Sequence, residues 1–216
     1  FVEFTDLIYN NLLIKVKNKV FEYFHQNNHR VLKDPMKVDG LYRLVREYIA
    51  PFSYIYYGCI PTISYLKVLR SFVSSEQSDT QFFHRDPGSY KLLKAVIYLS
   101  EVDTKSGPFV YVSHSNNDNL NGISGRNRYD DETIKRKYGS KVTEIVGKSG
   151  HVTFFNAMGL HRGKLPEENS RIALIVNFSL HDEYGQKDNY AKLSYEIKDD
   201  YDYVDMLLLS SSMPTF

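Results

Sequence analysis

The chain has 216 residues and a mass of 25.1 kDa, which is near the usual size of one domain and enough to bury a hydrophobic core without disulfide or metal staples. With 42% hydrophobic and 25% charged residues, the composition excludes intrinsic disorder and low-complexity or collagen-like repeats. The 27 basic and 26 acidic side chains leave a net charge of +1, which argues against nucleic acid or an acidic membrane as a partner attracted by overall charge.

The cysteine content and the N-terminal segment indicate a reducing compartment. Cys59 is the single cysteine, so the chain forms no internal disulfide and no thiolate zinc site. No apolar run reaches the roughly 18 residues of a membrane span, and residues 1–6 carry two acids where a signal peptide would carry basic residues. We therefore expect a cytoplasmic protein with no membrane partner, and a small, buried Cys59.

Two helices are predicted in the N-terminal quarter of the chain. An apolar residue recurs every four positions over 4–24, which is typical of an amphipathic helix, and Thr5 or Asp6 is the expected cap. A second helix is predicted to begin after Asp39 and to end at Pro51, with its apolar residues on one face.

From residue 62 onward the pattern changes to short segments rich in β-branched and aromatic residues, separated by Gly, Pro and Asp. The predicted strands are 62–73, 81–84, 93–99, 108–112, 142–146, 151–155 and 171–180. Because most are joined without helical crossovers, they indicate an antiparallel sandwich or barrel. The expected fold class is mainly β with flanking helices: a double-stranded β-helix, also called a jelly roll and cupin-like, with the N-terminal helices packed on one sheet.

The whole chain, 1–216, is expected to form one domain. Its expected parts are N-terminal helices over about 4–50, a jelly-roll core over about 62–180 and an insertion over 113–141. The insertion is polar, and we expect it to hold one short helix near 130–138 that ends at Gly139. The acidic C-terminal run before Met206 and the three leucines that follow fits either a closing element of the fold or an interface.

The insertion also has the features expected of a mobile lid over a substrate, because a long polar segment between two core strands is often functional. Its basic residues would favour an anionic substrate such as a carboxylate or a phosphate ester, although a solvated surface is the more common explanation of such residues. These residues are Arg126, Arg128, Lys135, Arg136 and Lys137.

Three residues form a candidate metal site. His84 and Asp86 are two positions apart at the end of a predicted strand, so both side chains can face one ion. His161, which follows a turn, a buried strand and a loop, is the expected third ligand, with His151 and His114 as competitors. Two histidines and one carboxylate on one face of an octahedral ion leave three positions open, as non-haem Fe(II) oxygen chemistry requires.

Two other patterns in the chain compete with this site. The similar run that begins at His181 opens a polar acidic stretch, and we interpret it as a chance match on a solvated surface. His84, Arg85 and Asp86 also match the catalytic-loop tripeptide of protein kinases, but Lys91 stands where that motif has Asn, and no Gly-rich phosphate loop precedes it. A kinase is therefore excluded.

Arg171 opens the most apolar predicted strand, ten residues after His161. An unpaired guanidinium is costly to bury, so Arg171 should have an anionic partner. Its planar fork suits the distal carboxylate of a dicarboxylic co-substrate, whereas the simpler alternative is an ion pair with Glu167 or Glu168.

These residues resemble the pattern of the Fe(II)/2-oxoglutarate-dependent dioxygenase superfamily. The run from Gln81 (QFFHRDPGSYKLLKAVIYL), the segment GHVTFFNAMGLHRG and the strand that opens with Arg are most similar to its phytanoyl-CoA dioxygenase-like branch, over about 81–180. The resemblance implies a double-stranded β-helix, Fe(II) bound by His84, Asp86 and His161, and 2-oxoglutarate anchored by Arg171. Since Asp86 fills the carboxylate position of the ligand set, the resemblance favours hydroxylation or desaturation over halogenation.

The leading hypothesis is therefore a dioxygenase that uses Fe(II), 2-oxoglutarate and O2 to hydroxylate a small-molecule substrate, with release of succinate and CO2. Gln81, just before the ligand pair, is expected to help orient the 1-carboxylate of 2-oxoglutarate. One alternative is a non-catalytic cupin-type metal-binding or structural module. Another is an oxygenase that acts on a side chain of a protein or on a nucleic acid. The near-neutral net charge of the chain disfavours a nucleic-acid substrate.

Overall fold

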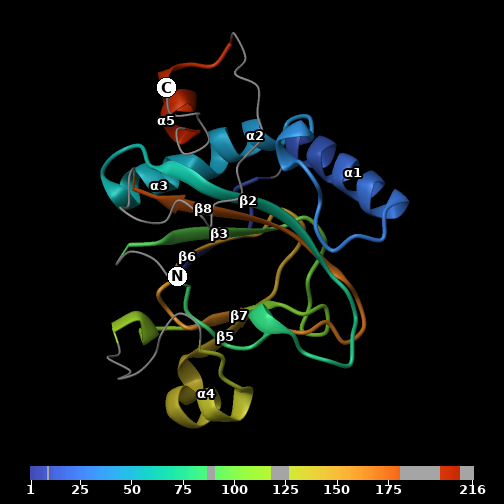
Figure 1. The fold of residues 1–216 in the computed structure, drawn as a ribbon, viewed down its shortest axis with the longest axis vertical. Coiled ribbons are helices and arrows are strands. Elements are labelled where there is room, and N and C mark those ends of the chain that lie inside the picture. Colours follow the sequence, from blue (N-terminus) through green and yellow to red (C-terminus); the bar gives the residue numbers. More distant parts are fainter. Residues whose placement is uncertain (9, 87–90, 118–126, 181–199, 210–216) are drawn as a thin grey trace.

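The computed structural model describes residues 1–8, 10–86, 91–117, 127–180 and 200–209 (Figure 1). Its strands are β1 (Val2–Phe4), β2 (Thr62–Ser71), β3 (Leu93–Tyr98), β4 (Phe109–Val112), β5 (Val142–Ile145), β6 (Val152–Asn156), β7 (His161–Gly163) and β8 (Arg171–Ser179). Its α-helices are α1 (Asn11–Gln26), α2 (Leu41–Leu44), α3 (Ala50–Tyr57), α4 (Asp131–Tyr138) and α5 (Tyr203–Leu208).

The strands form two antiparallel sheets. The major sheet has the order β1-β6-β3-β8-β2, and the minor sheet has the order β5-β4-β7. Helices α1, α2 and α3 lie along one face of the major sheet, and the minor sheet lies on the opposite side, with α4 beyond it (Figure 1). The expectation of a mainly β fold with flanking helices, packed on one sheet, is confirmed.

Alternation along β8 separates the two sides of the major sheet. Leu174, Val176 and Phe178 are fully buried in the core beneath the helices. Their neighbours on the strand, Ala173 and Ile175, pack in a second core toward the minor sheet. Because side chains alternate along a strand, Arg171 and Asn177 share the face of Ala173 and Ile175 and point between the sheets. The major sheet thus presents its polar side chains to the interior of the sandwich.

The predicted start of the first helix is wrong. Phe4 belongs to β1, where it pairs with Val152 at the edge of the major sheet. The helix begins at Asn11, and its cap is Asn10, whose side chain accepts a hydrogen bond from the Leu13 amide at 3.0 Å. The apolar spacing of four residues extends back to Phe4 because β1 and α1 both pack apolar side chains on the core. The apolar pattern alone therefore does not show where the strand ends and the helix begins.

The predicted end of the second helix is also wrong. Pro51 is the second residue of α3, and the helical segment runs through it to Tyr57. A π-helical turn over Val45–Ile49 joins α2 to α3. Gly58 ends α3 with a left-handed φ of 74°, a conformation that glycine adopts without strain.

Six of the seven predicted strands are present with nearly the predicted bounds. The exception is 81–84, where a 3₁₀ turn over Asp79–Gln81 is followed by isolated bridges at Phe83 and His84. The structure adds β7, which the sequence does not predict, because its three residues are too few to show alternation. It also adds β1, which the helical pattern concealed.

The short helix predicted in the insertion is confirmed as α4. The Asp130 side chain caps it by accepting a hydrogen bond from the Thr133 amide at 2.7 Å, and Gly139 follows its last residue. Residues 118–126 of the insertion, including Arg126, lie outside the described residues, so the lid stays a prediction. Cys59, expected to be buried, is exposed because it follows α3 on the surface. No helix among the described residues is both long and apolar enough to cross a membrane.

The C-terminal stretch closes the helical side of the core. Leu208 and Leu209 are fully buried in the same core as the outer face of the major sheet. Asp205 accepts hydrogen bonds from the Tyr42 hydroxyl at 2.6 Å and from Arg46 Nε at 3.1 Å, which ties α5 to the α2 region. Of the two sequence interpretations, the closing element is the one the structure supports.

This packing predicts that Leu208→Ala destabilises the protein. Removing a fully buried leucine loses apolar burial and leaves a cavity, so the free energy of unfolding should fall by about 2–5 kcal/mol in urea titrations. Tyr203→Ala, on the same helix with its side chain 75% exposed, is the control and should change it by less than about 0.5 kcal/mol. Equal effects of the two substitutions would show that α5 does not contribute to the core.

Candidate metal centre and its cavity

A backbone bridge brings the predicted metal ligands together. The His84 amide donates to the His161 carbonyl at 3.0 Å, and the His161 amide donates to the His84 carbonyl at 2.9 Å. The Asp86 amide donates to the Ala157 carbonyl at 3.0 Å, which holds the next turn of the chain against the loop before β7. As a result His84, Asp86 and His161 each offer a ligand atom, and these atoms lie within 4.8 Å of one another.

Both imidazoles are oriented by backbone carbonyls. Nδ1 of His84 lies 2.9 Å from the Phe82 carbonyl, and Nδ1 of His161 lies 2.9 Å from the Gly159 carbonyl. Because a carbonyl only accepts, each Nδ1 must carry the proton, and each Nε2 then presents a lone pair. The two Nε2 atoms lie 3.8 Å and 3.4 Å from the carboxylate oxygens of Asp86. This is the arrangement in which a second partner fixes a metal-binding histidine.

The charge states of His84 and Asp86 also suit a cation. Burial lowers the pKa of His84 to about 4, and repulsion from His161 adds to the effect, so His84 is neutral at pH 7. Burial alone would raise the pKa of Asp86, but His161 and Lys94 outweigh it and hold this pKa well below its usual range. Asp86 is therefore ionised and available as an anionic ligand.

One carboxylate oxygen of Asp86 is incompletely satisfied. Its Oδ2 lies 2.5 Å from Lys94 Nζ, yet this buried atom receives no hydrogen bond of normal geometry. Buried acceptors are normally hydrogen-bonded, so an acceptor in this condition beside two imidazole lone pairs fits a metal ligand. Two nitrogen donors and one carboxylate oxygen are the donor set of non-haem Fe(II), with room for further ligands.

The competing histidines do not join this cluster. His151 is buried beside Tyr98, and its nearest carboxylate is Glu3, 3.9 Å from Nε2. His114 is exposed and adopts a left-handed φ of 61° beyond the end of β4. His181 lies outside the described residues.

The cluster opens into a cavity between the two sheets. This cavity has a volume of about 680 Å³ and is lined by the inner faces of β2, β3 and β8 together with His84, Asp86 and His161. The rings of Phe155 and Phe109 lie 5.0 Å and 6.0 Å from the His161 ring, measured between centroids. The candidate metal centre therefore borders two aromatic rings on one side.

Arg171 lines the same cavity and is 9% exposed. It donates hydrogen bonds to the Gly107 carbonyl and, at 3.2 Å, to Ser71 Oγ. Gly163 leaves the space for its guanidinium, because a Cβ at that position would lie 2.6 Å from the nearer nitrogen. Burial lowers the pKa of Arg171, but a guanidinium stays protonated in proteins, so the cavity contains a buried positive charge.

No carboxylate of the described residues forms an ion pair with Arg171. The alternative partners have other cations: Glu167 pairs with Lys164 at 3.5 Å, and Glu168 pairs with Lys105. The alternative of an internal ion pair with either glutamate is therefore wrong. A buried guanidinium without a counterion is an open position for an anionic ligand.

Gln81 also lines the cavity, but its side-chain oxygen is engaged. It accepts hydrogen bonds from the Ser78 amide at 2.8 Å and from the Ser78 hydroxyl at 3.2 Å, which caps the 3₁₀ turn. The amide nitrogen of Gln81 is left as the group that could reach a ligand. Its expected role in orienting a carboxylate stays a prediction.

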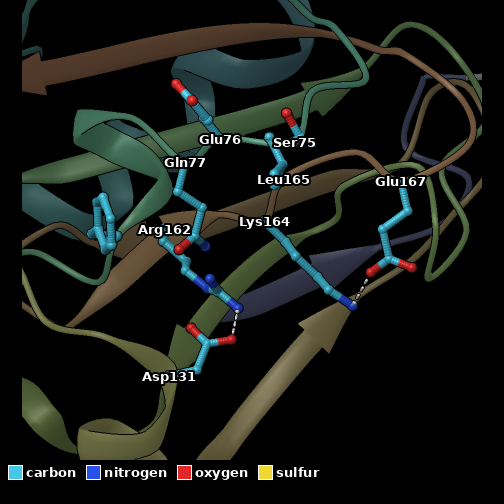
Figure 2. Close-up of a pocket in the computed structure, with 9 residues that line it drawn as sticks. Ser75, Glu76, Gln77, Asp131, Arg162, Lys164, Leu165 and Glu167 are labelled. Carbon is cyan, nitrogen blue, oxygen red and sulfur yellow. Dashed lines mark hydrogen bonds and ion pairs between the residues drawn. The ribbon is translucent and has the colours of Figure 1, made fainter.

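A second pocket, of about 670 Å³, opens on the surface beside Arg162 (Figure 2). Figure 2 shows Arg162 bound to Asp131, at 2.6 Å, and Lys164 bound to Glu167. Arg162 also stacks over the Phe83 ring, 4.7 Å from its centroid. The cations that this view draws are thus paired with acids. Arg162 accordingly has the anionic partner that Arg171 lacks.

Sequence reasoning missed two residues near the metal ligands, Lys94 and Gly163. A signal for Lys94 was present, because a single lysine interrupts the otherwise apolar strand 93–99 and must face a polar interior. Gly163 follows His161 by two positions on β7, but only the packed structure shows that Arg171 occupies the space it leaves. Of the basic residues in the insertion, Arg128 binds Asp79 at 2.7 Å at the edge of the cavity.

Comparison with known proteins gives a structural answer but no sequence match. No family model matches the chain, and no curated protein matches it by sequence. Among solved structures, the non-haem α-ketoglutarate-dependent carbocyclase SnoK of nogalamycin biosynthesis matches with a TM-score of 0.64 and 15% identity, over 84% of this chain and 79% of SnoK. The epimerase SnoN of the same biosynthesis matches with a TM-score of 0.66 and 15% identity, over 83% and 78%.

EctD from S. alaskensis, solved with 2-oxoglutarate and 5-hydroxyectoine, matches with a TM-score of 0.63 and 12% identity, over 83% of this chain and 71% of EctD. At these identities the comparison concerns the fold. The chain has the fold of non-haem iron, 2-oxoglutarate-dependent oxygenases.

The geometry predicts that Asp86→Ala loses metal binding without loss of the fold. Removing the only anionic ligand of three should weaken binding of Mn(II), a redox-stable probe, by at least about 100-fold in anaerobic calorimetric titrations. Circular dichroism should show unchanged secondary structure, since the side chain ends in the cavity. His114→Ala, an exposed histidine outside the cluster, is the control, and wild-type Mn(II) affinity in Asp86→Ala would refute the site.

Proposed function

We propose that this chain is a non-haem Fe(II)- and 2-oxoglutarate-dependent dioxygenase that hydroxylates a small-molecule substrate with release of succinate and CO2. One observation carries the proposal: a single cavity contains both the three-residue metal cluster and the buried Arg171, which has no anionic partner among the described residues. The similarity over about 81–180 to the phytanoyl-CoA dioxygenase-like branch supports it. The two facing sheets support a double-stranded β-helix within one domain.

His84 and His161 would bind the metal through Nε2, and Asp86 through one carboxylate oxygen. Fe(II) at such a site supplies O2 activation coupled to oxidative decarboxylation of 2-oxoglutarate. The carbonyls that hold both Nδ1 protons keep the two lone pairs aimed at one point, so little reorganisation accompanies binding. Lys94 keeps Asp86 ionised and holds its carboxylate at the cavity wall.

Arg171 would bind the distal carboxylate of 2-oxoglutarate. Its guanidinium offers a fork of donors, and the Ser71 hydroxyl beside it adds a further polar contact. A guanidinium nitrogen of Arg171 lies against Gly163 on β7. His161 is two residues from Gly163 on the same strand, which corresponds to about 6.6 Å along the backbone. This separation suits a five-carbon dicarboxylate whose other end reaches the metal.

The solved relatives support the co-substrate but leave the outcome of the reaction open. SnoN was solved with Fe3+, α-ketoglutarate and a nogalamycin derivative, and EctD with 2-oxoglutarate and 5-hydroxyectoine. Carbocyclase and epimerase activities occur on the same fold, so the fold does not choose the reaction. We propose hydroxylation rather than halogenation because Asp86 occupies the carboxylate position, and a small molecule because the cavity between the two sheets has a volume of about 680 Å³. We also propose the cytoplasm as its location, from the single cysteine.

The proposal predicts that Arg171→Ala raises the requirement for 2-oxoglutarate. Loss of a desolvated ion pair worth about 2–5 kcal/mol corresponds to an increase of about 30-fold or more in the half-saturating concentration. Calorimetric titration of 2-oxoglutarate into the Mn(II)-loaded protein measures this without a known substrate, and Mn(II) affinity should stay unchanged. Arg136→Ala, on the exposed face of α4, is the control.

An unchanged requirement for 2-oxoglutarate in Arg171→Ala would place the anchor elsewhere. Succinate release separates the proposal from the alternative of a non-catalytic cupin-type module. The wild-type protein with Fe(II), 2-oxoglutarate and O2 should release succinate slowly even without a substrate, and Asp86→Ala should release none. A protein that binds metal but forms no succinate under any condition would favour the module.

A further inference from the structure

The cavity has a second polar end that the metal cluster and Arg171 do not use. Asn177 lies on the inner face of β8, six residues beyond Arg171, which is a distance of about 20 Å along the strand. Between them the same face carries Ala173 and Ile175, which are apolar. The cavity wall therefore runs from one polar end, across an apolar middle, to another polar end.

Asn177 is 8% exposed and lines the cavity, yet its side-chain oxygen has no hydrogen-bond partner in the described part of the chain. The orientation of its amide is set by Ser64. The Ser64 hydroxyl donates to the backbone carbonyl of Asn177 at 3.3 Å, so Ser64 Oγ can only accept from the side-chain nitrogen, which lies 2.7 Å away. The amide oxygen is therefore the atom left without a partner, and it requires a hydrogen-bond donor.

Lys67 places a positive charge beside this amide. It lies on the cavity-lining face of β2, where Tyr65 is paired with Asn177 and Lys67 with Ile175, so Lys67 and Asn177 are diagonal neighbours about 7–8 Å apart. Lys67 is partly buried and forms no ion pair with any carboxylate of the described residues. Its Nζ lies over the Tyr65 ring, 5.7 Å from the centroid. Lys94, by contrast, is paired with Asp86.

We propose that Lys67 and Asn177 form a subsite for the primary substrate, which carries an acidic group and, next to it, a hydroxyl or amino group. The acidic group, a carboxylate or a phosphate, pairs with Lys67, and the neighbouring O–H or N–H donates to the amide oxygen of Asn177. The apolar part of the substrate then lies along Ile175 toward the metal ligands. This inference rests on the proposed function, which assigns Arg171 to 2-oxoglutarate.

In this proposal the acidic group of the substrate is recognised inside the cavity, by Lys67. The sequence had suggested an anionic substrate from the basic residues of the insertion, but Arg128 is engaged by Asp79. Lys135, Arg136 and Lys137 lie on α4, beyond the minor sheet from the cavity, and do not line it (Figure 1). Lys67 is the cavity-lining cation of the described residues that has neither a carboxylate partner nor an assigned co-substrate.

The test uses the protein loaded with Mn(II) and saturated with 2-oxoglutarate under anaerobic conditions, so that Arg171 is already occupied. The probes are 2-hydroxy and 2-amino acids of four to eight carbons, their methyl esters, the matching unsubstituted acids, and phosphate monoesters of the same chain lengths. Thermal shift measures binding, and succinate release in the Fe(II) protein measures productive binding. We expect free acids or phosphate monoesters to stabilise the protein and accelerate succinate release, and methyl esters to do neither.

The variants separate the two contacts. Lys67→Ala should raise the apparent Kd of the effective acid by at least about tenfold, and Lys67→Arg should restore most of the affinity, because the charge is retained. Asn177→Ala should abolish the preference for hydroxy or amino acids over unsubstituted acids. Lys135→Ala is the control. A preference for carboxylates over phosphates, or the reverse, identifies the acidic group.

Three results would overturn the subsite. These are equal binding of acids and their methyl esters, no stabilisation by any acid, and unchanged binding in Lys67→Ala. A raised 2-oxoglutarate requirement in Lys67→Ala would likewise reassign Lys67 to the co-substrate. Failure of the proposed function itself has a different signature, since the wild-type protein would then not bind 2-oxoglutarate in the presence of Mn(II).

Discussion

The candidate site depends on one pair of backbone hydrogen bonds, the reciprocal bridge between His84 and His161. His84 precedes His161, on the short strand β7, by 77 positions in the chain. The bridge between them places the two imidazole rings 4.5 Å apart, measured between centroids. Asp86 lies beside them because its amide donates a hydrogen bond to the Ala157 carbonyl, in the loop before β7. Backbone pairing alone thus brings the three candidate ligands together.

The space between the two sheets contains a buried positive charge, on Arg171, and a partly buried negative charge, on Asp86. At one end Arg171 is buried against glycine carbonyl and serine hydroxyl groups that cannot neutralise it. Near the middle, Asp86 is held ionised by Lys94. Burial of an uncompensated charge costs stability, so a bound dicarboxylate would stabilise the protein as well as serve the reaction. If Arg171 anchors the co-substrate as proposed, stability and co-substrate binding are coupled at this residue.

The apolar core explains how a polar cavity is tolerated in so small a chain. Even-numbered residues of β8 pack under helices α1 to α3, and the C-terminal leucines complete that layer. This one-sided core leaves the opposite face of the major sheet available for Arg171, Lys94 and Asn177. The rings of Phe109 and Phe155, 4.5 Å apart between centroids, pack on the His161 side of the cavity. The helices stabilise the sheet so that its other face can carry function.

The sequence by itself determined the fold class, the helix α4 and the identity of the candidate ligands and anchor. These depend on local features: alternation along 171–180, the Asp130 cap, and the spacing of His84, Asp86 and Arg171. Whether the last three act as expected is a matter for the experiments above. Their residue types restrict the chemistry enough that a metal and an anion could be expected from the amino-acid pattern alone.

Only the tertiary structure decided which groups meet. The start of α1 at Asn11 depends on β1 pairing with β6, and the passage of the helix through Pro51 depends on a π-turn, neither of which leaves a periodic signal. Among the described residues, Arg171 has no anionic partner and the amide oxygen of Asn177 has no hydrogen-bond donor, and both depend on packing between distant segments. Periodicity reports which side of one segment is buried, whereas a counterion or a hydrogen-bond partner comes from another segment, and folding alone places it.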